Sequence, residues 1–73
     1  MHYVYVLKRE GSWYIGYTGD LVRRLTEHKR KYKCNLVYYE AYSREDLARE
    51  REIKLKFYGS AWRGLRKRIE GGV

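Results

Sequence analysis

The sequence predicts an α+β fold in which helices flank a three-stranded, mainly antiparallel sheet, in the order β-β-α-β-α-α. Two observations carry this prediction. Short segments rich in Tyr and Val have the composition of strands, and longer segments with helical spacing of apolar residues follow capping signals. The chain has 73 residues, which is enough for a single domain with a small core. We therefore expect one domain over residues 1–73.

The first two strands are expected over residues 3–8 and 12–18, joined as a hairpin. Arg9-Glu10-Gly11 supplies the turn, because glycine adopts positive φ without strain. A loop of two or four residues would place Tyr5 and Tyr14 on the same face of the sheet, whereas a three-residue loop would place them on opposite faces. We favour the same face.

The first helix is expected from residue 21 to about residue 32, with Asp20 as its N-cap. Its apolar side contains Leu21, Leu25, His28 and Tyr32, at spacings of four, three and four.

A third strand is expected over residues 35–42. Ser43 and Asp46 form an S-x-x-D signal for a second helix from residue 44 to about residue 57. Gly59 should break that helix before a short basic helix over residues 61–69, and Gly71-Gly72 should form a flexible tail.

The charge of the chain favours a polyanionic partner. The net charge is +8 and the pI is about 9.8, and nucleic acid is the most common partner of such a surface. An acidic membrane surface and a merely soluble basic surface are the alternatives, although no segment is long enough to span a bilayer and none resembles a signal peptide. The one cysteine, Cys34, excludes an internal disulfide, and one Cys with two His does not suit a zinc site. We expect a cytoplasmic protein.

A tyrosine motif at residues 14–16 carries the strongest functional signal. Tyr14-Ile15-Gly16 follows Tyr3-Val4-Tyr5 by about one hairpin, and Arg24 lies on the next expected helix. This combination resembles the GIY-YIG nuclease family, in particular a small standalone domain related to the N-terminal domain of the excision-repair nuclease subunit. The second motif of the family is complete, and Tyr5 corresponds to the last residue of the first motif. The order of elements matches the family over nearly the whole chain.

The resemblance implies roles for individual residues. Tyr14 would be the general base, and Tyr5 would position water or phosphate. Arg24 would clamp the phosphate, since a guanidinium matches phosphate oxygens bidentately and Arg23 points away. His28 would be either a histidine at the edge of the core or a hydrogen-bonding partner at the site. Gly16 either lets a ligand approach the backbone or relieves crowding on the sheet.

Glu50 is the candidate metal ligand. Leu47, Ile53 and Phe57 define an apolar side of the second helix, and Glu50 lies in the middle of it, where a carboxylate needs a partner. The resemblance implies that Glu50 holds one divalent cation, Mg²⁺ or Mn²⁺. An ion pair of Glu50 with Lys54 or Arg24 is the alternative.

Two groups of basic residues are expected to hold the nucleic-acid backbone through phosphate contacts that depend on salt. Tyr38, Tyr39 and Tyr42 are expected to pack on the sheet rather than to stack on bases. The two groups are Lys29, Arg30, Lys31 and Lys33 after the first helix, and Arg63, Arg66, Lys67 and Arg68 beside Trp62 in the last helix.

The leading prediction is therefore a metal-dependent endonuclease that hydrolyses DNA, with structured or damaged DNA as the expected substrate. The alternative is a nucleic-acid-binding module that keeps the fold without catalysis.

Overall fold

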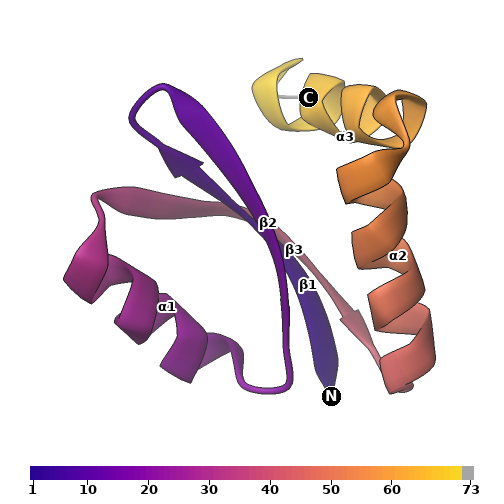
Figure 1. Ribbon diagram of the computed structural model, residues 1–73, viewed down its shortest axis with the longest axis horizontal. Helices are drawn as coiled ribbons and strands as arrows, with labels where there is room; N and C mark the ends of the chain where they lie inside the picture. Colours follow the sequence, from indigo (N-terminus) through magenta and orange to yellow (C-terminus); the bar gives the residue numbers. More distant parts are fainter. Residues whose placement is uncertain (72–73) are drawn as a thin grey trace.

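Three antiparallel strands form the centre of the structure, and helices lie on both sides of the sheet (Figure 1). The computed structural model describes residues 1–71. The elements are β1 His2–Arg9, β2 Ser12–Thr18, α1 Leu21–Lys31, β3 Cys34–Tyr42, α2 Glu45–Phe57 and α3 Gly59–Gly71. This order confirms the predicted α+β fold.

The strand β1 occupies the centre of the sheet, between β2 and β3. Arg9 pairs with Ser12, so the hairpin loop consists of Glu10 and Gly11, and Gly11 has a φ of 73°. Because the loop has two residues, Tyr5 and Tyr14 lie on the same face as diagonal neighbours, with Tyr5 opposite Gly16. The prediction that Tyr5 and Tyr14 lie on the same face of the sheet is confirmed.

Both faces of β1 are covered. Val4 and Val6 are buried in a core that they share with α2 and α3, through Ala48, Leu55 and Leu65. Tyr5 and Leu7, which alternate with these valines, are also buried, on the face that α1 covers. A strand between two layers of helices needs an unbroken apolar run, and residues 4–7 supply it.

The ends of the first two helices differ in how they are capped. The side chain of Asp20 accepts a hydrogen bond of 3.1 Å from the backbone N–H of Arg23, as predicted. The predicted S-x-x-D cap is wrong: α2 begins one residue later, Arg44 is its N-cap, and no side chain caps it. Ser43 therefore lies outside the helix, and Asp46 accepts hydrogen bonds from the guanidinium of Arg44 instead.

The predicted inward side of α2 is also wrong. Leu47, Ile53 and Phe57 are 41%, 50% and 76% exposed, whereas Ala48 and Leu55 are buried. The helix is turned by one residue, about 100°, relative to the expectation. The small side chain of Ala48 suits a close approach of the helix to Val4 and Val6.

A polar cluster ties α2 to β3 on this same face. The hydroxyls of Tyr38 and Tyr42 each donate a 2.6 Å hydrogen bond to Glu40, and Arg51 of α2 donates to the same carboxylate from Nε at 3.0 Å. Burial alone would raise the pKa of Glu40, but the hydrogen bonds from Arg51 and the two tyrosines lower it below its usual value. Sheet packing is confirmed for Tyr38 and Tyr42, while Tyr39 is exposed on the other face.

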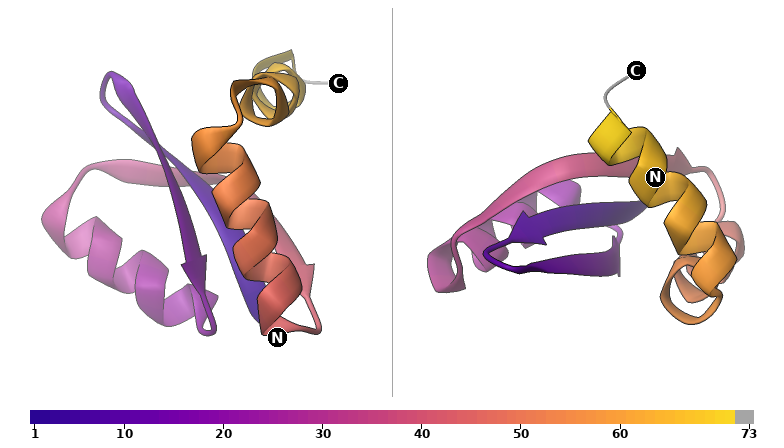
Figure 2. Two further views of the ribbon diagram at one scale, coloured as in Figure 1. Left: turned by 45° about the vertical axis from the view of Figure 1, so that its right-hand side comes forward. Right: turned by 90° about the horizontal axis from the view of Figure 1, so that it is seen from above.

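The last two helices meet at Tyr58, and α3 then turns away from the axis of α2 (Figure 2). Gly59 does follow the end of α2, but it is the first residue of α3, which is longer than the predicted 61–69. Gly71 belongs to α3 rather than to a tail, and the expected tail residue at position 72 lies outside the described residues.

Gly16 is the position at which the sheet tolerates no side chain. A Cβ there would lie 2.5 Å from Cζ and from Oη of Tyr5, and 2.9 Å from the ring of Tyr14. Gly16 is buried under these rings, so it relieves crowding on the sheet. This packing supports the interpretation that Gly16 relieves crowding on the sheet, and a contact of Gly16 with nucleic acid stays a prediction.

We therefore expect Gly16→Ala to lower the free energy of unfolding by about 1–3 kcal/mol, since the buried ring of Tyr5 must move. Gly19→Ala is the control, because a Cβ there meets nothing within 4 Å. That variant should stay within about 0.5 kcal/mol of the wild type. Urea unfolding of both variants measures the difference, and equal stabilities would contradict the contact.

Candidate functional site

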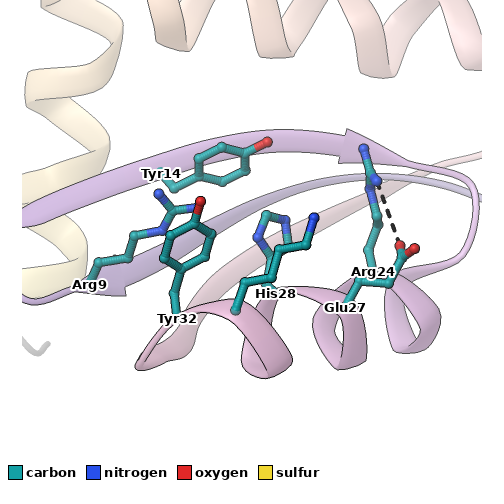
Figure 3. Close-up of a pocket in the computed structure, with 7 residues that line it drawn as sticks. Arg9, Tyr14, Arg24, Glu27, His28 and Tyr32 are labelled. Atoms are coloured by element: carbon teal, nitrogen blue, oxygen red, sulfur yellow. Dashed lines mark ion pairs between the residues drawn. The ribbon is translucent and has the colours of Figure 1, made fainter.

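A pocket of about 310 Å³ opens between α1 and the β1–β2 hairpin (Figure 3). It is lined by Arg9, Tyr14, Arg24, Glu27, His28, Lys31 and Tyr32. Three of these residues were predicted as catalytic from the sequence, namely Tyr14, Arg24 and His28. The fold thus brings together side chains from β2 and α1.

Tyr14 and His28 face each other across the pocket. Their ring centres are 4.8 Å apart, and both side chains are half-buried. His28 is on the apolar side of α1, together with the half-buried Leu21 and Leu25, as the helical spacing predicted. Tyr14 reaches the pocket because the two-residue hairpin loop turns its side chain to this face.

Tyr5 lies beneath the pocket rather than in it. Its side chain is 0% exposed, and its Oη is 2.9 Å from Nε2 of His28. Burial raises the pKa of Tyr5 to about 12, with a further rise from the neighbouring Tyr14, so its hydroxyl stays protonated at neutral pH. Because the side chain is sealed from solvent and contacts His28, Tyr5 could act on water or phosphate in this arrangement only through His28. Its predicted role in placing water or phosphate stays a prediction.

His28 is therefore the hydrogen-bonding partner at the site that the sequence left as one of two alternatives. Burial lowers its pKa below the ordinary value, and the positive charges of Arg9 and Arg24 lower it further. The imidazole is consequently neutral near pH 7.

Arg24 borders the pocket and Arg23 does not, as predicted. The guanidinium of Arg24 is about half-exposed, and its recorded ionic contact is a 3.6 Å approach to Glu27 one turn later. Exposed ion pairs of this kind contribute little to stability, so the guanidinium remains available to an anion. Arg23 lines a neighbouring surface beside Thr18 and Asp20, which Arg24 also borders.

Arg9, Glu27 and Tyr32 are the pocket residues for which the sequence predicted no role at a site, and Arg9 is the one held by two aromatic rings. Its Cζ lies 4.6 Å from the ring centre of Tyr14 and 4.2 Å from that of Tyr32. In Figure 3 the guanidinium lies between the two rings. The sequence analysis assigned Arg9 to the turn. The two-residue loop could have revealed it, because that register puts Arg9 on the same face as Tyr5.

Glu50 lies outside the pocket. Its side chain is 61% exposed and forms a 3.1 Å ion pair with Lys54, which was the alternative considered from the sequence. Its predicted inward position is wrong, because α2 is turned as described above. Within residues 1–71, no group of three or more His, Cys, Asp or Glu side chains is arranged to hold a metal ion.

The turn of α2 that carries Glu50 nevertheless lies beside the end of β2. The guanidinium of Arg49 is 4.3 Å from the ring centre of Tyr17, near the end of that strand. Arg24 lies in the first turns of α1, which begins shortly after the same strand end. Figures 1 and 2 show the end of β2 and the starts of α1 and α2 at one end of the sheet.

The two predicted groups of basic residues lie on opposite sides of the sheet. All eight side chains are exposed. Lys29, Arg30, Lys31 and Lys33 lie at or just beyond the end of α1, and Lys31 lines the pocket. Arg63, Arg66, Lys67 and Arg68 belong to α3, beyond the other face, where Arg66 pairs with Glu70 at 2.8 Å. The α1 group is thus the one beside the pocket.

Among residues 1–71, no helix combines the length and the apolar character that a membrane crossing requires.

Comparison with known proteins identifies the family. The chain is 37% identical to a UPF0213 protein of Staphylococcus aureus strain Mu3 over 67 aligned positions, which cover 78% of this chain and 82% of the relative. The chain belongs to the UPF0213 family. This UPF0213 chain is also 57% identical over 28 residues to a UPF0213 protein of Halalkalibacterium halodurans, a match that covers 37% of the chain and 30% of the relative. No family model and no solved structure matches the chain.

We expect the stability of this UPF0213 protein to depend on His28 in mildly acidic solution. The pKa of His28 is lowered in the folded state, so below the unfolded-state value of about 6.5 the unfolded chain binds the proton more readily. The contribution of His28 is therefore fully present above that value and is lost as the pH falls toward the folded-state pKa.

Urea unfolding between about pH 7.5 and 5.5 tests this expectation, because ordinary carboxylates titrate below that range. The free energy of unfolding of the wild type should fall with pH. In His28→Gln, which has no group to protonate at this position, the fall should be smaller. Equal slopes would show that His28 is not held in its neutral form.

Proposed function

We propose that the chain is an endonuclease of GIY-YIG type, which hydrolyses phosphodiester bonds of DNA in the pocket between α1 and the hairpin. One observation carries this proposal. Tyr14 and Arg24, the positions that the resemblance to GIY-YIG nucleases implies as base and clamp, line the same pocket together with His28. Membership of the UPF0213 family is compatible with this activity and does not by itself define it.

Hydrolysis of a phosphodiester requires a water to lose a proton as it attacks phosphorus, while negative charge grows on the phosphoryl oxygens. In this proposal the hydroxyl proton of Tyr14 first passes to solvent, and the resulting phenolate oxygen, which lines the pocket, takes the proton of the attacking water. Arg24 donates two hydrogen bonds to the phosphoryl oxygens, a geometry that lysine cannot reproduce. The bond from phosphorus to the leaving oxygen then breaks, and that oxygen takes a proton from solvent water.

The charge distribution of the pocket supports the binding of a phosphate. Arg9, Arg24 and Lys31 contribute three positive charges, whereas Glu27 contributes one negative charge. His28 and Tyr5 remain neutral and hold the geometry through their hydrogen bond. A phosphodiester in the pocket would thus meet an excess of positive charge, and the side chains beneath it, Tyr5 and His28, would be neutral.

A divalent cation is part of the proposal through Glu50. The carboxylate is exposed, and its surface pair with Lys54 is weak enough to be displaced. Mg²⁺ is commonly bound by one or two carboxylates together with substrate phosphates and several waters. A single accessible glutamate suits such a site, and the helical turn that carries Glu50 neighbours the end of β2 through Arg49. When bound, Mg²⁺ or Mn²⁺ supplies charge neutralisation at the phosphate and acidifies coordinated water.

A nucleic-acid-binding module without catalysis is the second candidate. The position of Glu50 favours it, because that carboxylate pairs with Lys54 on the outer side of α2 rather than lying in the pocket. An exposed Glu50 therefore does not by itself argue for catalysis. Activity measurements separate the two functions directly.

Tyr14→Phe tests the catalytic proposal. The variant keeps the ring that packs on His28 and removes only the hydroxyl, so stability should stay near that of the wild type. Turnover should fall by about 10²- to 10⁴-fold, the usual contribution of a positioned acid–base group. DNA affinity should change only slightly. Tyr39→Phe is the control, because Tyr39 is exposed on β3 and does not line the pocket.

The measurement is single-turnover cleavage of labelled branched, flapped, single-stranded and duplex DNA with Mg²⁺ or Mn²⁺, beside a thermal melt of each variant. Normal cleavage by Tyr14→Phe, or a loss of activity explained by unfolding, would show that the tyrosine is structural. DNA binding without any cleavage by the wild type would support the binding module.

Glu50→Gln tests the proposed metal ligand, with Glu45→Gln as a matched control. Glu45 lies on the same helix, is 55% exposed and also pairs with a basic residue at i+4, Arg49 at 3.0 Å. We expect Glu50→Gln to lose cleavage at all cation concentrations or to require much more Mg²⁺, and Glu45→Gln to behave like the wild type. EDTA should abolish cleavage. Equal Mg²⁺ dependence in both variants would remove Glu50 from the site.

A further inference from the structure

The guanidinium of Arg9 lies between two aromatic rings of the pocket. It is held between the rings of Tyr14 and Tyr32, at 4.6 and 4.2 Å from their centres (Figure 3). Cation–π contacts of this kind fix the plane of the guanidinium and leave its N–H groups free for hydrogen bonds in that plane. Arg9 is thus a cation whose orientation is set before any ligand arrives.

The hydrogen-bonding capacity of Arg9 is not satisfied within the described chain. Its Nε is buried and has no hydrogen-bond partner, and residues 1–71 offer it no ion pair. Glu27, the acidic residue of the pocket, approaches Arg24 instead. A cation that lines a pocket and has no ion pair there favours a ligand that accepts hydrogen bonds and carries negative charge.

Arg9 and Arg24 lie at opposite ends of the pocket. Arg24, His28 and Tyr32 follow one another along α1 at successive turns, which spans about 12 Å of helix. Arg9 packs on Tyr32 at one end, Arg24 stands at the other, and His28 lies between them (Figure 3). The pocket is therefore long enough for more than one phosphate and has an arginine at each end.

We propose that Arg9 binds the phosphate next to the scissile one, so that the pocket holds two successive phosphates of a single nucleic-acid strand. This inference rests on the proposed function, because it assigns the scissile phosphate to Arg24. It predicts that the protein prefers strands with a neighbouring phosphate over a lone phosphodiester.

The experiment compares a DNA dinucleotide, which has one phosphodiester, with a trinucleotide, which has two. Binding is measured in EDTA by NMR titration of the ring signals of His28, so the readout does not depend on cleavage. The wild type should bind the trinucleotide about tenfold more tightly, as expected for one additional charge-assisted hydrogen bond. A trinucleotide with one phosphate replaced by an uncharged methylphosphonate should lose that gain.

Arg9→Met is the decisive variant, because it keeps an unbranched apolar side chain between the rings and removes the charge. It should bind both ligands with nearly equal affinity, because the loss of affinity relative to the wild type should be larger for the trinucleotide than for the dinucleotide. Lys8→Met is the matched control: Lys8 precedes Arg9 and lies over Trp13 rather than in the pocket, so its removal should preserve the trinucleotide gain.

A full trinucleotide gain in Arg9→Met, or an equal loss of affinity for both ligands, would overturn the proposal. If a thermal melt shows that Arg9→Met does not fold, Arg9→Lys serves in its place. It should lose most of the gain, because an ammonium lacks the planar fork, and a full gain would overturn the proposal. The wild type could bind the trinucleotide more tightly in a way that depends on Arg9 and yet cleave no DNA. That result would support the two-phosphate site and contradict the nuclease function.

Discussion

The packing of Tyr5 across Gly16 determines how the sheet meets α1. Tyr5 is buried in the central strand, and its ring lies over the glycine of the edge strand, where a Cβ would come within 2.5 Å of the phenol. In that position its hydroxyl reaches Nε2 of His28. The side chain of Tyr5 thereby contacts β2 and α1 at once. Tyr14 lies on β2 and Arg24 lies on α1, so this contact also sets their positions relative to each other. The glycine of the Tyr-Ile-Gly motif is explained here by packing.

The same contact divides the site into a neutral layer and a charged layer. Burial keeps both Tyr5 and His28 neutral, because it raises the pKa of the phenol and lowers the pKa of the imidazole. Tyr14 adds to the effect on Tyr5, and the positive charges of Arg9 and Arg24 add to the effect on His28. Arg9, Arg24 and Lys31 lie above them with one carboxylate among them, Glu27. Such a site attracts phosphate through its cations, while its geometry is maintained by groups whose charge does not change near neutral pH. This arrangement is what connects the fold to the proposed chemistry on DNA.

Local rules predicted the parts of the structure that depend on local interactions. The strand alternation, the parity of the hairpin, the Asp20 cap and the choice of Arg24 over Arg23 all follow from spacing within one or two elements. The orientation of α2 does not. Three of its four bulky apolar residues, Leu47, Ile53 and Phe57, are exposed, whereas Ala48 and Leu55 pack on the core. On the same side of the helix Arg51 donates to Glu40 of β3. The role of Arg9 depends on Tyr32, a residue distant in sequence, and periodicity cannot reveal that contact.

The central claim is that nucleic acid binds at the pocket between α1 and the hairpin, although both sides of the sheet carry exposed basic residues. The most direct test is an NMR titration of the protein with single-stranded DNA in EDTA, in which backbone amide shifts locate the contact. The account predicts that the largest changes fall in residues 9–18 and 24–33, around Tyr14 and His28. Changes centred on α3, around Arg66 and Lys67, with the pocket unaffected, would contradict it.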